Sequence, residues 1–486
     1  MSKVYVYLWF DIEDYVTKES DDLPLTAFKI LKKYDVPVSC KIVAEKVLAL
    51  QKNGRSDVIT AMSEYDVGFH MSKHSQHPTI YEYLADLDVR SGAKEFLARE
   101  GVGFELVKQV FGRTPSCFGH PGSAWAPHVY PALSKLGIPV YLDETSILNL
   151  NDQPYWYCGI LNLNGANRNF MLFDYTFEDP RGVEALKKKF KTIHSRLQRK
   201  NGGAVSILFH LHTSINKKFW DEVNFGNGQN RSEEEYERPP AQPPEITRRA
   251  WEAFDELIRH ISQFKDVEFI TATSAAKLYD RASPKTLDKK QLRDVAKHFT
   301  HSTDYLRDDG IVLSPAEGLN AITKALTTYA ASGRIPEQIE LQEPLGPMTP
   351  FRSKGKRKLQ SKDLIVAAES VLNHMNAEGC IPSSINVGQS GILSPEDFLA
   401  TASKLLNKLL SNQRLPETIT VTKSDRPNLR YINESSFQKA CKWKVLPSGF
   451  KAPKILEQIK LQAWTLKPAT IKTQDLSSST SANLPA

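Results

Sequence analysis

Hydrophobic and polar positions follow two alternating patterns through the first 280 residues. Residues 4–10 form a continuous apolar run, rich in aromatic and β-branched side chains, that ends in acids and predicts a buried strand. Residues 25–34 space their apolar side chains as one helix face does, and residues 36–43 return to strand composition. An amphipathic stretch at 183–200 then precedes the apolar run 204–209. Strands separated by helices predict an α/β fold with a parallel sheet, whose active site lies at the carboxyl ends of the strands.

The pattern changes after residue 283, where a helix-and-turn unit recurs. Segment 313–339 matches segment 393–419 at ten positions, and a looser copy lies between them at 372–385. Each unit predicts a Ser-Pro helix start, an amphipathic helix and an x-Pro turn into a short extended piece. Units this short cannot bury their own apolar faces, so neighbours must stack.

The change of pattern predicts three regions. We expect a catalytic domain at 1–282 and helical repeats at 283–425. We expect a degenerate last repeat and a disordered Ser/Thr-rich tail at 426–486.

Composition and charge support this division. The 486 residues are 41% hydrophobic and 24% charged, which is typical of globular chains and excludes disorder of the whole chain. Up to residue 280 there are 34 basic and 37 acidic side chains, whereas the remainder has 29 and 19, a net charge of +10. The basic run at 352–358 contains glycine and resembles a linker, so we expect no nucleic-acid partner.

Other sequence features limit the cellular setting. No apolar run reaches the ~20 residues that a membrane-spanning helix needs. The apolar stretch near the N-terminus covers seven residues and runs into acids, unlike a signal peptide, so we expect a cytoplasmic protein. The five cysteines lie far apart without a Cys-x-x-Cys pair, which fits neither a disulfide framework nor a cysteine zinc site.

Residues suited to metal binding and acid–base chemistry gather near predicted strand ends. His70 and His74 are four apart, which would place both imidazoles on one face of a helical turn, where they can share a metal ion. The other candidates follow two strands: Asp11, Glu13, Asp14, His210 and His212. A divalent ion held by two histidines and one carboxylate keeps positions open for water, as in hydrolytic metal sites. Each group also has a purely structural alternative. His70 and His74 would be surface residues, the acids would form a capping loop, and His210 and His212 would be core histidines.

The order of these clusters resembles the polysaccharide deacetylase family, carbohydrate esterase family four, with its NodB-like homology domain. The resemblance covers about residues 4–280. It rests on residues 9–15 (Trp-Phe-Asp-Ile-Glu-Asp-Tyr), similar to the family branch with Asp-Val-Glu-Asp, on a His-x-x-x-His pair and on a late Leu-x-His. It implies a distorted (β/α) barrel, a divalent metal, most commonly zinc, and removal of acetyl groups from N-acetylated sugars.

Residue by residue, the resemblance implies a base, an acid and a set of metal ligands. The base is Asp11, and the acid is His210, with His212 as the alternative. The implied metal ligands are His70, His74 and either Glu13 or Asp14.

One family motif is altered in this chain. The third motif of the family is Arg-x-Pro-x-Gly, and its arginine orients the base. Here residues 118–123 are Phe-Gly-His-Pro-Gly-Ser, so Pro121 and Gly122 match but the arginine is missing. Gly119 or His120 stands near its place. His120 is the candidate to orient Asp11, and the same loop is expected to help hold the oxyanion.

The repeats resemble the pseudomurein-binding repeat of archaeal and phage wall proteins. The resemblance covers about residues 295–425 and rests on a helix followed by Arg-x-Pro-x-x-Ile. It implies binding of a sugar-containing polymer, and a helical spacer or oligomerisation module is an equal alternative.

Taken together, these features predict a metal-dependent amide hydrolase. It would remove N-acetyl groups from amino-sugar residues of a polysaccharide or glycan intermediate, with zinc as the cofactor. Two alternatives remain open: a metal-free amidohydrolase of the allantoinase type, and a non-catalytic glycan-binding protein on the same fold.

Overall fold

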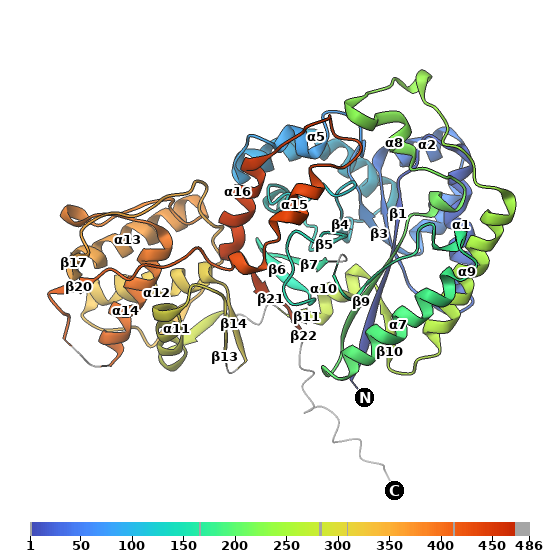
Figure 1. The fold of residues 1–486 in the computed structure, drawn as a ribbon. Coiled ribbons are helices and arrows are strands. Elements are labelled where there is room, and N and C mark those ends of the chain that lie inside the picture. The colour runs from blue at the N-terminus through green and yellow to red at the C-terminus, as the bar shows by residue number, and fades with distance from the viewer. Residues whose placement is uncertain (1, 165–166, 281–283, 309, 412–413, 472–486) are drawn as a thin grey trace, which may run out of the picture.

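The computed structural model describes residues 2–471 apart from 165–166, 281–283, 309 and 412–413. Residues 2–280 build a large α/β part and residues 284–424 a smaller helical part (Figure 1). The segment 426–471 returns from the helical part to the α/β part. The predicted fold class, an α/β sheet region followed by a mainly helical region, is confirmed.

One mixed sheet organises the α/β part. Its strand order is β21-β6-β7-β5-β4-β3-β2-β1-β9-β8, and β10 pairs with the first half of β1. The strands are β1 (Val4–Ile12), β2 (Ser39–Ile42), β3 (Asp66–Phe69), β4 (Cys117–Phe118), β5 (Val140–Asp143), β6 (Tyr155–Tyr157), β7 (Ile160–Asn164), β8 (Phe170–Leu172), β9 (Gly203–Phe209), β10 (Val267–Ile270) and β21 (Lys467–Pro468). Neighbouring pairs from β7 to β8 are parallel, so their carboxyl ends meet at one edge.

Helices connect the strands, as the sequence pattern predicts (Figure 1). They are α1 (Leu23–Lys32), α2 (Ala44–Lys52), α3 (Ser56–Ser63), α4 (Ile80–Leu84), α5 (Val89–Phe111), α6 (Val129–Leu136), α7 (Gly182–Gln198), α8 (Trp220–Phe225), α9 (Pro244–Ser262) and α10 (Ala272–Leu278). On β1, Leu8 and Phe10 point into a large core beneath these helices, whereas Tyr7 and Trp9 point into a smaller core that includes α10. Burial on both faces explains why the strand is apolar throughout.

The helical part contains two strand–helix–helix–strand units. The first consists of β12 (Thr286–Asp288), α11 (Lys289–His301), α12 (Pro315–Ser332) and β15 (Gln338–Glu340). The second consists of β17 (Lys358–Gln360), α13 (Ser361–Glu378), α14 (Pro395–Leu410) and β20 (Thr418–Thr420). The first and last strands of each unit pair antiparallel. Short strands fill the connections: β13 (Leu306–Asp308), β14 (Ile311–Leu313), β16 (Lys354–Gly355), β18 (Ile385–Asn386) and β19 (Gly391–Leu393).

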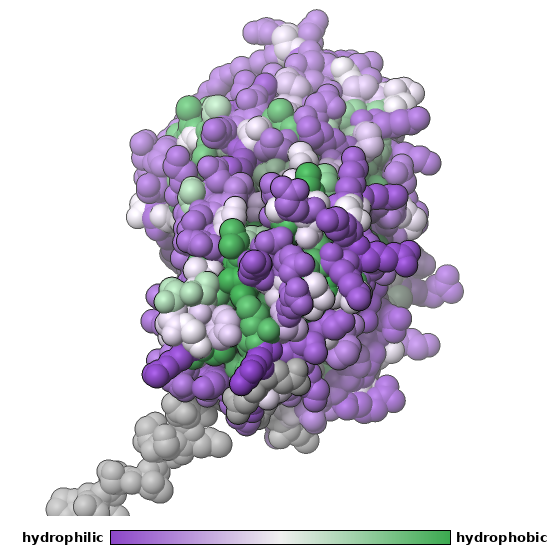
Figure 2. Space-filling model, turned by 90° about the vertical axis from the view of Figure 1, so that its left-hand side faces the viewer, coloured by the Kyte–Doolittle hydropathy of each residue, from purple (hydrophilic) through white to green (hydrophobic). Residues whose placement is uncertain are grey.

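The predicted Ser-Pro helix starts are confirmed at α12 and α14. Ser314 accepts a hydrogen bond from the Glu317 N–H at 3.3 Å, and Ser394 accepts one from the Asp397 N–H at 3.4 Å. The helices of the two units interleave, because α11 packs on α14 and α12 packs on α13 around one shared core. The face of the molecule seen in Figure 2 is mostly hydrophilic, with hydrophobic areas between polar side chains, the most extended of them in the lower half of the view.

The prediction for residues 426–471, a degenerate last repeat, is wrong. This segment forms α15 (Glu434–Ala440), α16 (Pro453–Gln462) and two short strands, β21 and β22 (Thr470–Ile471). Strand β21 pairs with β6 of the main sheet, and Phe437 and Ile455 belong to the core of the α/β part. The disordered tail predicted after residue 471 lies outside the described residues.

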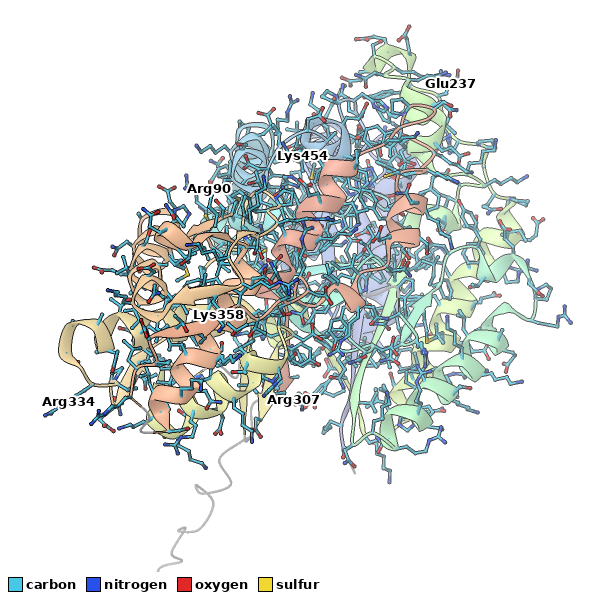
Figure 3. All side chains as sticks on the ribbon, turned by 60° about the vertical axis from the view of Figure 1, so that its left-hand side comes forward. Arg90, Glu237, Arg307, Arg334, Lys358 and Lys454 are labelled. Atoms are coloured by element: carbon cyan, nitrogen blue, oxygen red, sulfur yellow. The ribbon has the colours of Figure 1, made fainter. Side chains whose placement is uncertain are left out.

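The same segment joins the two parts of the molecule. Lys467 of β21 makes a fully buried ion pair of 2.8 Å with Glu317 of α12. Trp464, from the turn that follows α16, lies in the core of the helical part. Arg90 of α5 also reaches Glu378 of α13 at 2.6 Å, so a helix of the α/β part contacts the helical part directly (Figure 3). In the described part of the chain, no helix is long and apolar enough to cross a membrane.

Candidate active site

Polar side chains from six parallel strands converge at the carboxyl edge of the sheet. Each comes from the last residues of a strand or from the first two residues that follow it, as the sequence pattern predicts for an α/β active site. They are Asp11 of β1, Lys41 of β2, His70 after β3, His120 after β4, Asp143 of β5 and His210 after β9. All are at least nine-tenths buried, and His210, with 9% of its surface exposed, is the most accessible.

The Glu13 carboxylate is the centre of a histidine cluster. Its Oε2 lies 3.3 Å from His70 Nε2 and 3.0 Å from His74 Nε2. Its Oε1 lies 3.0 Å from His212 Nε2 and accepts a 3.3 Å hydrogen bond from Trp220 Nε1. Burial would raise the pKa of Glu13, but His74, His212 and His70 hold it well below its ordinary value. Glu13 is therefore an anion surrounded by imidazoles.

The far nitrogens of two histidines are fixed by hydrogen bonds. His70 Nδ1 faces the Gly119 carbonyl at 2.9 Å, and only a protonated Nδ1 can donate to a carbonyl. His74 Nδ1 lies 2.6 Å from Ser75 Oγ, which itself donates to Asp221 at 2.8 Å, so His74 must donate as well. In their neutral forms both rings would therefore point the Nε2 lone pair at the Glu13 carboxylate. With no cation between them, burial would lower the pKa of His74, but Glu13 raises it above its ordinary value, so that a proton takes the place of the cation.

This donor set fits a cation. Two lone pairs aimed at one carboxylate repel unless positive charge lies between them, and His74 Nε2 is buried without a hydrogen-bond partner in the described residues. Glu13, His70 and His74 can place one ligand atom each within 4.8 Å of one another. Imidazoles oriented by a carbonyl and by a serine–carboxylate pair are typical of metal ligands with supporting outer contacts.

Two details of the expected metal site differ from the structure. The prediction that His70 and His74 lie on a helical turn is wrong, because residues 70–79 form a loop in which Met71 and His74 have positive φ angles of 70° and 55°. The loop brings the two rings together, with their centroids 4.9 Å apart. Of the two candidate carboxylates, Glu13 lies with the histidines.

Asp14 points away from the cluster. Its Oδ1 accepts hydrogen bonds from the Val16 and Thr17 N–H groups at 3.0 and 2.8 Å, and its Oδ2 accepts one from Asn216 at 3.0 Å. Asp14 therefore closes the loop after β1 and has no oxygen facing His70 or His74.

Asp11 is held by a buried lysine that the sequence analysis missed. Lys41 Nζ lies 3.1 Å from Asp11 Oδ1 and 3.6 Å from Asp143 Oδ2, and the Lys41 side chain is fully buried. Burial would lower the pKa of Lys41, but Asp11 and Asp143 raise it, so the ammonium stays charged. Burial also opposes ionisation of Asp11, yet His70, Lys41 and His210 hold its pKa below the ordinary value.

The surroundings of Gly119 explain why the arginine of the family motif is missing from this loop. A Cβ atom at residue 119 would lie 2.0 Å from Lys41 Nζ and 2.7 Å from Asp143 Oδ2. Residue 119 therefore borders the space that the ammonium fills, and the cation comes instead from β2, the strand that pairs with β1.

His120, which we expected to orient Asp11, contacts other groups. Its Nδ1 lies 3.1 Å from Asp143 Oδ2 and 2.7 Å from the Tyr141 hydroxyl. Burial and the charge of Lys41 hold the pKa of His120 well below its ordinary value, so the ring is neutral. Burial also raises the pKa of Asp143 to about 7. His120 thus contacts Asp143 and not Asp11. It is connected to Asp11 only through Lys41, which lies between the two carboxylates.

His210 is paired with a second carboxylate that the sequence analysis missed. Asp174 Oδ2 lies 2.5 Å from His210 Nδ1, and Asp174 Oδ1 accepts the His210 backbone N–H at 2.9 Å. Burial would lower the pKa of His210, but Asp174 raises it well above the ordinary value. The free Nε2 lies 3.5 Å from Asp11 Oδ2, so an imidazolium and a carboxylate stand next to each other.

The remaining predicted residues border this centre. His212, the alternative acid, contacts Glu13 and lies 2% exposed beneath the cluster, less accessible than His210. Pro121 and Gly122 form the loop after β4, and Gly122 has a positive φ of 54°. Among the missed residues, Lys41 could have been recognised from the sequence. A lysine inside the apolar run 36–43 is expected to be buried, and a buried ammonium must pair with carboxylates. Asp143 and Asp174 had no motif to mark them.

Comparisons with known proteins give only distant likenesses. No protein-family model and no curated protein matches the chain. Among solved structures, similarity is found to a probable polysaccharide deacetylase from Pseudomonas aeruginosa PAO1, with 14% identity, 57% of this chain and 90% of that chain covered, and a TM-score of 0.38. The allantoinase Puue has 12% identity, the same coverages and a TM-score of 0.37. A 4-alpha-glucanotransferase from Thermococcus litoralis has 10% identity, 57% and 40% coverage, and a TM-score of 0.40. With scores below 0.5, these likenesses carry no functional argument.

Proposed function

We propose that this chain is a metal-dependent amide hydrolase that removes N-acetyl groups from amino-sugar residues of a glycan. The observation that carries the proposal is the arrangement of a Glu13–His70–His74 donor set beside the Asp11 carboxylate and the His210–Asp174 pair. This combination supplies the three needs of amide hydrolysis: a Lewis-acid site, a base for water and an acid for the amine.

The metal would be held by Glu13, His70 and His74. The mixed nitrogen and oxygen donors suit zinc, which accepts imidazole and carboxylate ligands. When bound there, a divalent ion would polarise the acetyl carbonyl and lower the pKa of the attacking water.

Asp11 would act as the base. It is ionised at neutral pH, and Lys41 fixes its Oδ1, so Oδ2 is free to accept the proton of the water that attacks the carbonyl carbon. Oδ2 is also the oxygen that faces His70 and His210, at 3.8 and 3.5 Å from their Nε2 atoms. The Lys41 ammonium holds this orientation in place of the missing arginine.

His210 would act as the acid. Asp174 keeps the ring protonated and directs Nε2 into the site, so the imidazolium can donate its proton to the departing amine as the carbon–nitrogen bond breaks. Acetate and a free amino sugar are then released, and the proton taken by Asp11 balances the one given by His210. The Gly122 N–H remains the proposed oxyanion contact in the loop at 119–122, because Pro121 has no N–H and the Gly119 N–H already donates to the Phe69 carbonyl at 3.2 Å.

The donor set favours this proposal over the two alternatives. A metal-free amidohydrolase has no use for two imidazoles whose Nε2 atoms face one carboxylate. A protein that only binds glycan has no use for a buried imidazolium–carboxylate pair at the rim of the site. Glycan binding by the helical part is a separate proposal that rests on the repeat pattern alone.

A substrate panel tests the proposal. Purified protein would be assayed for acetate release from N-acetylated mono- and oligosaccharides, and for turnover of allantoin, with Asp11→Asn as the inactive control. Asp11→Asn should keep its metal and lose roughly 10²–10⁴-fold in rate, as removal of a general base does. Allantoin turnover, or equal rates for wild type and Asp11→Asn, would reject the proposal.

A further inference from the structure

The segment that returns from the helical part forms one wall of the active site. Residues 443–445 lie along α8 and the loop after it, where the Asn227 and Gly228 N–H groups donate to the Lys444 and Val445 carbonyls at 2.9 Å each. Lys444 Nζ also pairs with Glu222 at 2.8 Å. Val445 packs with Trp220, whose indole contacts Glu13. The wall is therefore anchored on elements that touch the metal-binding residues.

Trp443 is the residue of this wall that faces the candidate site. Its ring lies edge-on to the His74 ring, with centroids 6.4 Å apart and planes at 82°. The indole also presses against Gly122 of the oxyanion loop, where a Cβ atom would lie 2.4 Å from Trp443 Cε2. Two features therefore require glycine at position 122: its backbone has a positive φ, and the indole leaves no room for a side chain. The Trp443 side chain is only half-buried, so part of the ring is open to a ligand.

A second half-buried aromatic ring contacts two other histidines of the site. Phe219 packs edge-on against His210 and His212, with centroid distances of 5.2 and 4.8 Å. Two neutral aromatic rings, one against His74 and one against His210, therefore border the histidine cluster around Glu13. Flat apolar faces of this kind bind uncharged rings through dispersion contacts, because many weak atom pairs add up over a flat surface.

We propose that Trp443 forms a sugar-binding subsite, on which the pyranose ring that carries or adjoins the reacting acetamide stacks. This inference rests on the proposed function and adds a substrate feature to it: a neutral sugar ring beside the scissile amide. It also means that a segment lying beyond the helical repeats completes the active site of the α/β part.

The experiment compares three variants with wild type. Trp443→Ala removes the indole, and Trp443→Phe keeps a smaller aromatic face. Phe450→Ala is the matched control, because Phe450 lies on the same segment but stacks on Tyr81, with centroids 6.3 Å apart. Each protein would be assayed for acetate release from N-acetylated oligosaccharides such as the N-acetylglucosamine tetramer, and its metal content and Tm would be measured.

Trp443→Ala should raise KM for the best tetramer by about tenfold or more at nearly constant kcat, because it removes binding that ground state and transition state share. Trp443→Phe should recover most of this loss, and Phe450→Ala should stay within about threefold of wild type.

Three results would overturn the inference while leaving the proposed function intact: an unchanged KM in Trp443→Ala, a Trp443→Phe variant no better than alanine, or an equal KM increase in Phe450→Ala. A wild-type protein that releases acetate from no N-acetylated sugar would instead reject the proposed function, and this inference with it.

Discussion

Removing the buried cation at residue 41 should disturb the orientation of the base Asp11, and placing a cation at residue 119 instead should restore it. In the structure the Lys41 ammonium stands between two buried carboxylates, 3.1 Å from Asp11 and 3.6 Å from Asp143. At 3.1 Å and an effective dielectric constant of about 20, the Lys41–Asp11 attraction is worth roughly 5 kcal/mol. Removing one partner of such a buried pair costs about 3–5 kcal/mol. Lys41→Ala should therefore lower Tm and reduce kcat by roughly 10²-fold or more.

The rescue variant uses the space beside residue 119 that the Lys41 side chain vacates in Lys41→Ala. Gly119→Arg alone should fail, because its Cβ would lie 2.0 Å from Lys41 Nζ and would bring a second cation next to the first. In the double variant Lys41→Ala, Gly119→Arg, both contacts with the lysine are gone, and a guanidinium can enter from the loop after β4 once the Asp143 carboxylate, 2.7 Å from the new Cβ, shifts to accept it. Gly119 does not have a positive φ, so a side chain there causes no backbone strain.

The assay is acetate release at saturating substrate, with Tm and metal content as controls for folding. The double variant should regain at least about tenfold over Lys41→Ala, which corresponds to 1.4 kcal/mol of recovered interaction. A double variant that folds and retains metal, yet is no more active than Lys41→Ala, would refute the idea that a cation at this place orients Asp11.

Three further predictions concern the ligands, the acid and the C-terminal segment. His74→Ala should lose the metal and the activity with little change in Tm, and stoichiometric metal in this variant, measured by elemental analysis, would contradict the ligand assignment. Because Asp174 raises the pKa of His210, activity that needs the imidazolium is present below that pKa and is lost as pH rises through it. Asp174→Asn should therefore move the alkaline limb of kcat/KM to lower pH, and an unmoved limb would exclude His210 as the acid. Truncation after residue 425 removes β21 and exposes core contacts of the α/β part, so it should yield insoluble or strongly destabilised protein, and a soluble chain with wild-type Tm would contradict this.

Local sequence patterns predicted the strand ends but not the contacts between them. Apolar runs that end in polar residues located Asp11 and His210 correctly, since parallel strands bring such ends to one edge. The His70–His74 spacing identified the pair but wrongly suggested a helical turn. The same four-residue spacing also fits a loop with two positive φ angles. Spacing alone does not record backbone conformation.

The orienting cation and the site wall depended on long-range pairing. Lys41 meets Asp11 only because β1 and β2 are neighbours in register, with Asp11 opposite Lys41. Trp443 reaches Gly122 across more than 300 positions of the chain, and no periodicity links them. The repeat pattern predicted α12 and α14 because their Ser-Pro starts are local signals, whereas the return of residues 426–471 to the main sheet leaves no local signature.

The central proposal is most directly tested by titrating zinc into metal-free protein while following acetate release from an N-acetylated oligosaccharide. The chelated protein should be inactive, and activity should rise linearly with added zinc and level off at one equivalent per chain. The same titration of the double variant His70→Ala, His74→Ala should stay flat. Full activity in the chelated protein, or zinc-dependent activity in the double variant, would contradict hydrolysis at the Glu13–His70–His74 site.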